Sequence, residues 1–299
     1  MASENKQYIR CNLCQSGDYR YLDYRGGKNI AQCNICGLVY RNPRFLSKPD
    51  RETDSVRNYG DYIAMEERVS IARERIFRKT LQGLEKRIKN PGRSILDIGC
   101  GQGYFLKAAK ENGWQVQGVE PVKSACEYAK QKFAIDILNA SMEEARFKDN
   151  SFDVVTMWNV LDHMSDPLGT LKEIKRILKP NGIVVARIPN VSWHLFCNDL
   201  FSVIPSRLTR DRFKDPSVVI NYGYSNKTLK KLFKKAGFNS VRVGNSLLSS
   251  GDPYRSLHAV KDSSVMALKN IYFALSQISY YLSFGKYTTG TSLLVYARK

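Results

Sequence analysis

The sequence lacks a long uninterrupted hydrophobic run. None of its stretches reaches the roughly eighteen consecutive apolar residues of a membrane-spanning helix, so a conventional span is not expected. Residues 1–6 also lack the apolar core of a secretion signal. We therefore expect a cytoplasmic protein. Because disulfides are rare in that compartment, the seven cysteines point to metal binding or to buried thiols.

Acidic residues are scarce relative to basic ones. The chain has 28 Asp and Glu against 47 Lys and Arg, a net charge of +19. Residues 52–205 are nearly balanced, whereas residues 1–51 hold 9 basic and 4 acidic side chains and residues 206–299 hold 16 and 4. A basic periphery suits an anionic partner, such as a phosphorylated small molecule, RNA or a membrane surface. The alternative is a basic solvated surface without a specific partner.

Four cysteines near the N-terminus form two closely spaced pairs. Cys11 and Cys14 are followed, after eighteen residues, by Cys33 and Cys36. This C-x2-C-x18-C-x2-C spacing falls within the range of four-thiolate zinc sites. Four thiolates leave no open coordination position, so the predicted zinc is structural. We expect a small zinc ribbon over residues 1–45; the alternative is four unrelated free thiols.

A glycine-rich turn connects a predicted strand to a predicted helix. Residues 95–98 are apolar enough for a buried strand, and Gly99, Gly101 and Gly103 follow at alternate positions. Glycine lets the backbone bend sharply and approach a ligand closely. A second predicted strand ends at Glu120, where nucleotide-binding units place an acid that accepts hydrogen bonds from ribose hydroxyls. The third glycine comes too early for the dinucleotide fingerprint G-x-G-x-x-G.

Strand and helix patterns alternate through the centre of the chain. Such alternation predicts an α/β fold with a parallel sheet and crossover helices. The predicted strands are Arg93–Ile98, Gln115–Val119, Ile135–Leu138, Phe152–Met157 and Ile183–Ile188, and the helices are Gly103–Asn112, Val122–Lys132 and Leu168–Leu178. Residues 46–92 are expected to form a linker and a helix that covers the core, and residues 93–299 the main domain.

The C-terminal third is less regular in its pattern. Residues 189–219 are predicted to be irregular, and a helix over 226–236 follows. An insertion over residues 244–290 interrupts the last strand pair. Within it, residues 265–284 are apolar at i+3 and i+4 spacing, which predicts a helix that covers the core or forms an interface. An interfacial membrane helix is an alternative, although its polar face lacks the usual cationic residues.

Several ordered motifs resemble those of class I S-adenosylmethionine-dependent methyltransferases. The glycine turn with Glu120 is similar to that family's motif I and second-strand acid. Three later segments resemble, in order, its fourth strand, its N-V-L-E-H…D-P segment and its L-K-P-G-G turn; they are residues 152–155, 159–167 and 178–182. The resemblance covers about residues 90–190. It implies a Rossmann-like sheet whose last strand is antiparallel, and S-adenosylmethionine as methyl donor. A doubly wound fold without cofactor is the alternative.

The resemblance also implies which residues hold the cofactor. The glycine turn would place the methionine part, Glu120 the ribose, and the loop after the third strand the adenine. The implied cofactor-binding residues are Asp97, Gly99, Cys100, Gly101, Gly103, Glu120, Pro121, Ser141, Met142, Trp158 and Asn159.

His163 is the histidine that lies inside a recognised motif. A neutral imidazole accepts a proton near pH 7, so His163 is the candidate general base; the alternative is a structural brace of its loop. The order of zinc ribbon, linker and core resembles bacterial methyltransferases of glycan and natural-product biosynthesis. That order implies O-methylation of a small molecule such as a sugar. The alternatives are an RNA methyltransferase, whose ribbon and basic C-terminal third bind phosphates, and a non-catalytic binding module.

Overall fold

The computed structural model describes most of the chain. The described ranges are residues 6–22, 29–45, 59–88, 93–202, 219–249 and 263–299. Within them, no helix is both long enough and apolar enough to cross a bilayer.

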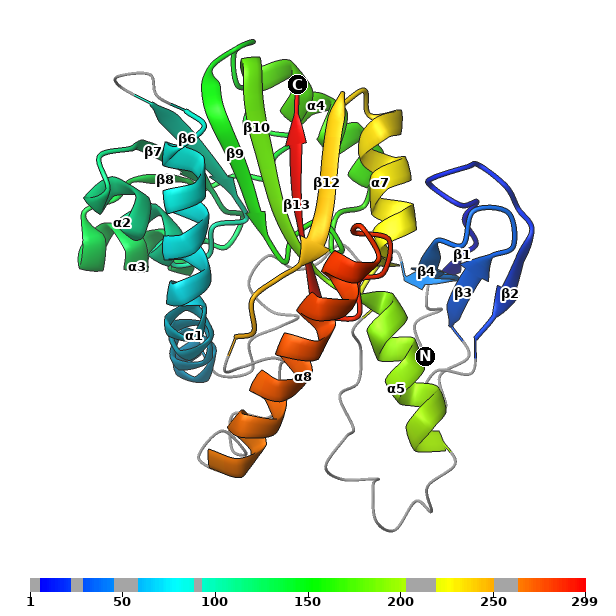
Figure 1. Ribbon diagram of the computed structural model, residues 1–299. Helices are drawn as coiled ribbons and strands as arrows, with labels where there is room; N and C mark the ends of the chain where they lie inside the picture. Colours follow the sequence, from blue (N-terminus) through cyan, green and yellow to red (C-terminus); the bar gives the residue numbers. More distant parts are fainter. Residues whose placement is uncertain (1–5, 23–28, 46–58, 89–92, 203–218, 250–262) are drawn as a thin grey trace.

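A seven-stranded sheet forms the core (Figure 1). Its strands are β6 (Ser94–Ile98), β7 (Gln115–Val119), β8 (Ile137–Leu138), β9 (Phe152–Trp158), β10 (Leu178–Pro189), β12 (Ser240–Asn245) and β13 (Ser292–Arg298). Their order is β12-β13-β10-β9-β6-β7-β8. The strands from β10 to β8 are parallel, and β13 is antiparallel to both of its neighbours. The predicted parallel sheet with an antiparallel last strand is confirmed.

Helices cover both faces of this sheet, and two more extend beyond one of its edges (Figure 1). The covering helices are α1 (Tyr59–Glu85), α2 (Tyr104–Glu111), α3 (Lys123–Phe133), α4 (Pro167–Ile177) and α7 (Asn226–Lys235), and the two beyond the edge are α5 (Val191–Ser202) and α8 (Ser263–Leu282). Successive strand residues point to opposite faces, so Val154 packs with α1 and α2 while Val155 packs with α4 and α7. Asp166 caps α4 by accepting a 3.1 Å hydrogen bond from the Gly169 amide, and Ser225 caps α7 in a capping box.

One expectation about the C-terminal third is wrong, and for a second segment one of the alternatives is excluded. Residues 191–202, expected to be irregular, form α5 directly after β10. The apolar stripe of α8 does not cover the core, because Ile271, Leu275 and Ile278 on it are each more than half exposed. Both helices extend beyond the lower edge of the sheet in Figure 1.

The four cysteines belong to a second, smaller sheet. Its strands are β2 (Tyr19–Tyr21), β3 (Ile30–Cys33), β4 (Val39–Arg41) and β11 (Tyr222–Gly223), in the order β11-β4-β3-β2. Strands β1 (Lys6–Gln7) and β5 (Arg44–Phe45) pair with each other in a separate two-stranded sheet; in the sequence they come directly before β2 and directly after β4. We call the described part of residues 6–45 the cysteine module. Because β11 comes from the main domain, the module shares a sheet with it.

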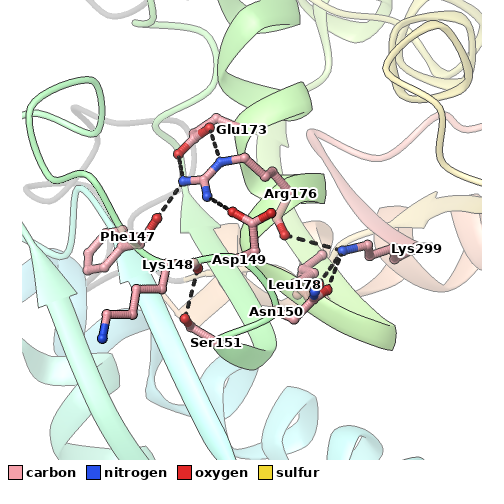
Figure 2. A network of polar contacts seen from close by, with 9 residues as sticks. All are labelled: Phe147, Lys148, Asp149, Asn150, Ser151, Glu173, Arg176, Leu178 and Lys299. Atoms are coloured by element: carbon pink, nitrogen blue, oxygen red, sulfur yellow. Dashed lines mark hydrogen bonds and ion pairs between the residues drawn. The ribbon is translucent and has the colours of Figure 1, made fainter.

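A polar network closes one edge of the main sheet (Figure 2). Arg176 of α4 pairs with Glu173 and Asp149, and the Lys299 ammonium donates to the Asn150 side chain at 2.8 Å. Residues 147–151 lead into β9, so this is the edge where the parallel strands begin. The ligand-binding edge of such a sheet is the opposite one, where the strands end.

Candidate functional site

The glycine turn lies at the carboxyl end of β6. Gly99, Gly101 and Gly103 have φ of 61°, 51° and 78°, a left-handed conformation that glycine adopts without steric cost. A Cβ added at Gly99 would lie 2.7 Å from the Val160 side chain, so the turn and the loop after β9 are in contact. The first of these glycines therefore has both a conformational and a packing reason to lack a side chain.

Two buried carboxyl groups lie beside this turn. The Glu120 carboxylate, after β7, accepts hydrogen bonds from the amides of Gly101 at 2.9 Å and Val122 at 3.0 Å. Asp97 on β6 accepts a 2.6 Å hydrogen bond from the Thr156 hydroxyl. Burial raises the pKa of Asp97 well above its ordinary value, and the negative charge of Glu120 adds to that rise. A ligand with an ammonium group and hydroxyl donors, as in S-adenosylmethionine, fits this pair of acids.

The predicted adenine loop follows β8. The Ser141 amide and hydroxyl both donate to the Glu144 carboxylate at 2.9 Å, and Met142 is buried in the main core cluster. The Ser141 hydroxyl is thus engaged within its own turn, and the Asn139 side chain donates to the backbone carbonyls of Glu120 and Pro121. The bonds of Asn139 hold this loop against the backbone that follows β7.

Trp158 and Asn159 end β9 at the same edge. The Trp158 ring packs against Phe77 and Phe105 at centroid distances of 4.8 and 4.9 Å, and no hydrogen bond reaches its indole nitrogen within the described residues. Asn159 has φ of 59°, and its side-chain oxygen accepts a 3.1 Å hydrogen bond from Arg187. These contacts explain the position of both residues at the edge.

Arg187 was not anticipated from the sequence. Its guanidinium is fully buried on β10 and also donates to the Ser246 hydroxyl at 3.0 Å. A charged residue within the apolar run 183–188 was the available signal, because a buried charge needs hydrogen-bonding partners. Arg187 connects β10, the end of β9 and the segment after β12.

The loop after β9 places His163 beside Asp162. The His163 Nε2 lies 3.7 Å from Asp162 Oδ2; the His163 side chain is half exposed, whereas that of Asp162 is buried. Burial raises the pKa of Asp162, and the nearby His163 lowers it in part. The pair therefore has one half-exposed ring nitrogen backed by a buried carboxyl.

The four predicted metal ligands come together in the structure. The Sγ atoms of Cys11, Cys14, Cys33 and Cys36 all lie within 4.8 Å of one another. Zn–S bonds of about 2.3 Å place tetrahedral sulfurs about 3.8 Å apart, so the cluster fits a zinc ion. Gly37, after the second pair, has φ of 81°, which turns the chain back into β4.

The cysteine module contacts the loop that carries His163. The Asn12 side chain donates to Asp166 at 3.1 Å, and Arg44 donates to the Ser165 carbonyl at 3.0 Å. The amides of Asn221, directly before β11, and of Tyr222, its first residue, both donate to the Asp162 carbonyl at 3.1 Å. The loop over residues 162–166 is thus held by the module on one side and by β9 and α4 on the other.

Comparisons with known proteins identify the family of this chain. A family model described as "Methyltransferase domain" matches residues 69–243. The ubiquinone biosynthesis O-methyltransferase of Haemophilus ducreyi is 32% identical over 103 residues, which cover 31% of this chain and 44% of that protein. The demethylmenaquinone methyltransferase of Staphylococcus saprophyticus is 28% identical over 215 residues, covering 66% and 91%. The chain thus spans less than half the length of the first of these relatives.

A solved structure supports the fold. It is a methyltransferase from Thermotoga maritima described as a possible histamine N-methyltransferase; it has 22% identity and a TM-score of 0.51, and the match covers 80% of this chain and 97% of that one. Since the family model spans more than half of the chain, this protein belongs to the methyltransferase domain family, with the fold of the class I S-adenosylmethionine-dependent enzymes.

Proposed function

We propose that this protein transfers the methyl group of S-adenosylmethionine to a hydroxyl oxygen of a small molecule, such as a sugar or a related metabolite. The carrying observation is that the loop bearing His163 packs against the glycine turn, through Val160 on Gly99, at the ligand-binding edge of the sheet. A proton acceptor and a cofactor cradle thus share one edge.

The residues of this edge divide the work of the transfer. The bound cofactor supplies an electrophilic methyl group on its sulfonium. Gly99, Gly101 and Glu120 hold the donor; His163 takes the proton from the acceptor hydroxyl as its oxygen forms the bond to the methyl carbon. With its carbon–sulfur bond broken in the transfer, the donor would be released as S-adenosylhomocysteine. The buried Asp162 favours the imidazolium that results, through the proximity of its carboxyl.

Two further observations support a small acceptor. The named relatives are an O-methyltransferase of ubiquinone biosynthesis and a demethylmenaquinone methyltransferase, both names of small-molecule chemistry. In addition, no N-P-P-Y or D-P-P-Y motif of the amino-group methyltransferases follows Trp158. The zinc in the cysteine module is structural in this proposal, because its four sulfurs complete the coordination shell.

The decisive experiment offers radiolabelled S-adenosylmethionine with separated small-molecule and RNA fractions of cell material. Label is expected in the small-molecule fraction with wild type and is expected to be reduced with Glu120→Ala at the same S-adenosylmethionine concentration. Label found in RNA alone would overturn the proposal and favour the alternative, in which basic side chains bind phosphates.

A further inference from the structure

Helix α8 exposes a stripe of aliphatic side chains to solvent, although it packs on the protein along its other side. Its inward side holds Ser276, which is buried and whose carbonyl accepts a 2.9 Å hydrogen bond from the side chain of Asn245, the last residue of β12. Its outward stripe holds Ile271, Leu275, Ile278 and Leu282, exposed by 58, 59, 53 and 77%. Surface helices of globular proteins bury the apolar stripe and expose the polar one.

The apolar surface continues past the end of the helix. Phe284 is fully exposed on a left-handed turn with φ of 51°, and Tyr281 and Tyr287 are exposed by 73 and 58%. The Lys286 ammonium lies 5.5 Å from the Tyr287 ring centre. Aromatic rings beside a cationic side chain are typical of the boundary between water and lipid headgroups. We call the outward stripe of α8 together with residues 281–287 the α8 tip face.

The charge around this face is of one sign. Residues 263–287, which comprise α8 and the turn after it, contain two basic residues, Lys269 and Lys286, and no Asp or Glu, and the whole chain carries +19. A second copy of the chain would bring an equal positive charge to the face, which opposes association, whereas an anionic surface is attracted. Charge therefore discriminates between the two occupants that an exposed apolar helix most often has.

The position of α8 connects this face with the ligand-binding edge. The Tyr272 ring of α8 packs on Trp193 of α5 at a centroid distance of 4.4 Å, and α5 begins directly after β10 ends. Figure 1 shows both helices extending beyond the edge at which the parallel strands end. A surface docked on α8 would lie on the same side of the molecule as the glycine turn.

We infer that the α8 tip face docks this protein on the surface of an anionic phospholipid bilayer, with its apolar side chains inserted at the headgroup boundary. The inference uses exposure, polarity and charge, and it does not depend on the identity of the methyl acceptor. It concerns an interfacial contact, in which the helix lies on the membrane.

Vesicle co-sedimentation of the full chain tests the inference. Wild type is expected to bind vesicles of equal parts phosphatidylcholine and phosphatidylglycerol, to bind phosphatidylcholine vesicles more weakly, and to lose anionic binding in high salt. The double substitution Leu282→Ser/Phe284→Ser is expected to weaken binding at least about tenfold, because two large apolar side chains leave the bilayer. Both side chains are mostly or fully exposed, so the fold does not depend on them.

Ile71→Ser provides the matched control. Ile71 on α1 is 57% exposed, close to the exposure of Ile271, but lies outside the α8 tip face, so this variant is expected to bind as wild type does. Absence of wild-type binding to anionic vesicles would overturn the inference, as would equal binding by the double variant. A wild-type dimer that the double substitution dissociates, seen by light scattering without lipid, would assign the face to a second copy and overturn it too.

Discussion

At the scale of single residues, the Glu120 side chain links the end of β7 to the glycine turn through a hydrogen bond. Its carboxylate already accepts the Gly101 amide, so it orders the turn as well as offering oxygen atoms to a ribose. Glu120→Ala is expected to weaken S-adenosylmethionine binding by about 1–3 kcal/mol, the scale of a lost charge-assisted hydrogen bond. Titration calorimetry measures this change directly.

Glu111→Ala is the control for that measurement. Glu111 pairs with Lys107 on the exposed side of α2, away from the turn, so its removal should leave cofactor affinity unchanged. If Glu120→Ala binds the cofactor as tightly as wild type, the ribose assignment is wrong.

His163 is the residue whose role bears most directly on the chemistry. If it is the general base, His163→Gln is expected to lower turnover by about 10²–10⁴-fold while cofactor affinity is kept, because glutamine has similar polarity but takes no proton at neutral pH. Turnover is measured against pH on an identified hydroxyl acceptor. Wild type should lose activity as the imidazole protonates in acid, and the variant should lack this limb.

A second variant helps to distinguish the two roles of His163, a general base or a structural brace of its loop. Asp162→Asn removes the negative charge beside the imidazole with little change of shape, so turnover should fall while the acidic limb is kept. Turnover of His163→Gln within about threefold of wild type, far below a general-base effect, would leave His163 as a brace of its loop.

At this scale the sequence identified residues whose role depends on local spacing. The two cysteine pairs and the three glycines are each specified by neighbours within a few positions. The structure brings the four thiols into one cluster and gives the three glycines a left-handed conformation. Arg187 escaped prediction because its partners Asn159 and Ser246 come from distant segments. Contacts between segments depend on the tertiary fold, and one sequence does not reveal them.

At the scale of secondary-structure elements, one buried carboxylate connects three strands of the main sheet. Asp153 on β9 accepts hydrogen bonds from the Lys179 ammonium on β10 at 2.8 Å and from Ser94 on β6. Although burial alone would raise the pKa of Asp153, these donors lower it below its ordinary value. A carboxyl with a lowered folded-state pKa stabilises the fold above its unfolded pKa of about 3.9, and this contribution disappears as pH falls through the folded value.

Asp153→Asn is therefore expected to lower the free energy of unfolding by about 1–3 kcal/mol at neutral pH. The difference from wild type should shrink below about pH 4, where the wild-type carboxyl becomes protonated. Urea unfolding at several pH values measures it, with the exposed Asp136→Asn as control. A loss that stays the same at all pH values would assign the effect to shape and not to charge.

The cysteine module makes a second prediction at this scale. Cys33→Ser is expected to abolish the one bound zinc per chain and to speed hydrogen exchange in β3 and β4, because a sheet this small depends on its metal. Exchange in β11 should rise as well, since it pairs with β4. Metal analysis and exchange mass spectrometry provide the readouts.

Cys197→Ser is the matched control, because Cys197 lies on α5 outside the cluster and its loss should leave the metal in place. Wild-type protein purified without zinc would contradict the assignment.

Sequence periodicity predicted whether a segment is a helix or a strand more reliably than it predicted what the segment packs against. The alternation of strands and helices through residues 93–190 predicted the sheet, because each pattern has one compatible partner geometry. The stripe on α8 predicted a helix correctly but not its environment, since an apolar stripe has the same sequence whether it faces a core or solvent. Residues 191–202 were missed because their apolar residues form no clear stripe.

At the scale of the whole molecule, the cysteine module acts on the site through the loop at residues 162–166. It touches that loop from Asn12 and Arg44, while β11 adds a strand to its sheet and binds the Asp162 carbonyl. The glycine turn, in contrast, is positioned by β6, β7 and the Val160 contact. Acceptor side and donor side therefore depend on different parts of the chain.

This division predicts that disturbing the module separates turnover from cofactor binding. Arg44→Ala removes the bond to the Ser165 carbonyl and the contact of the guanidinium with the Tyr222 ring at 4.6 Å. It is expected to lower turnover by about tenfold to a hundredfold, because small displacements of a catalytic loop are costly. Affinity for S-adenosylmethionine and zinc content should stay unchanged.

Arg20→Ala is the control: Arg20 bonds Gln32 within the module and is not bonded to the loop. If Arg44→Ala turns over like Arg20→Ala, the module does not position the loop; if it also loses cofactor affinity, donor and acceptor sides are not independent.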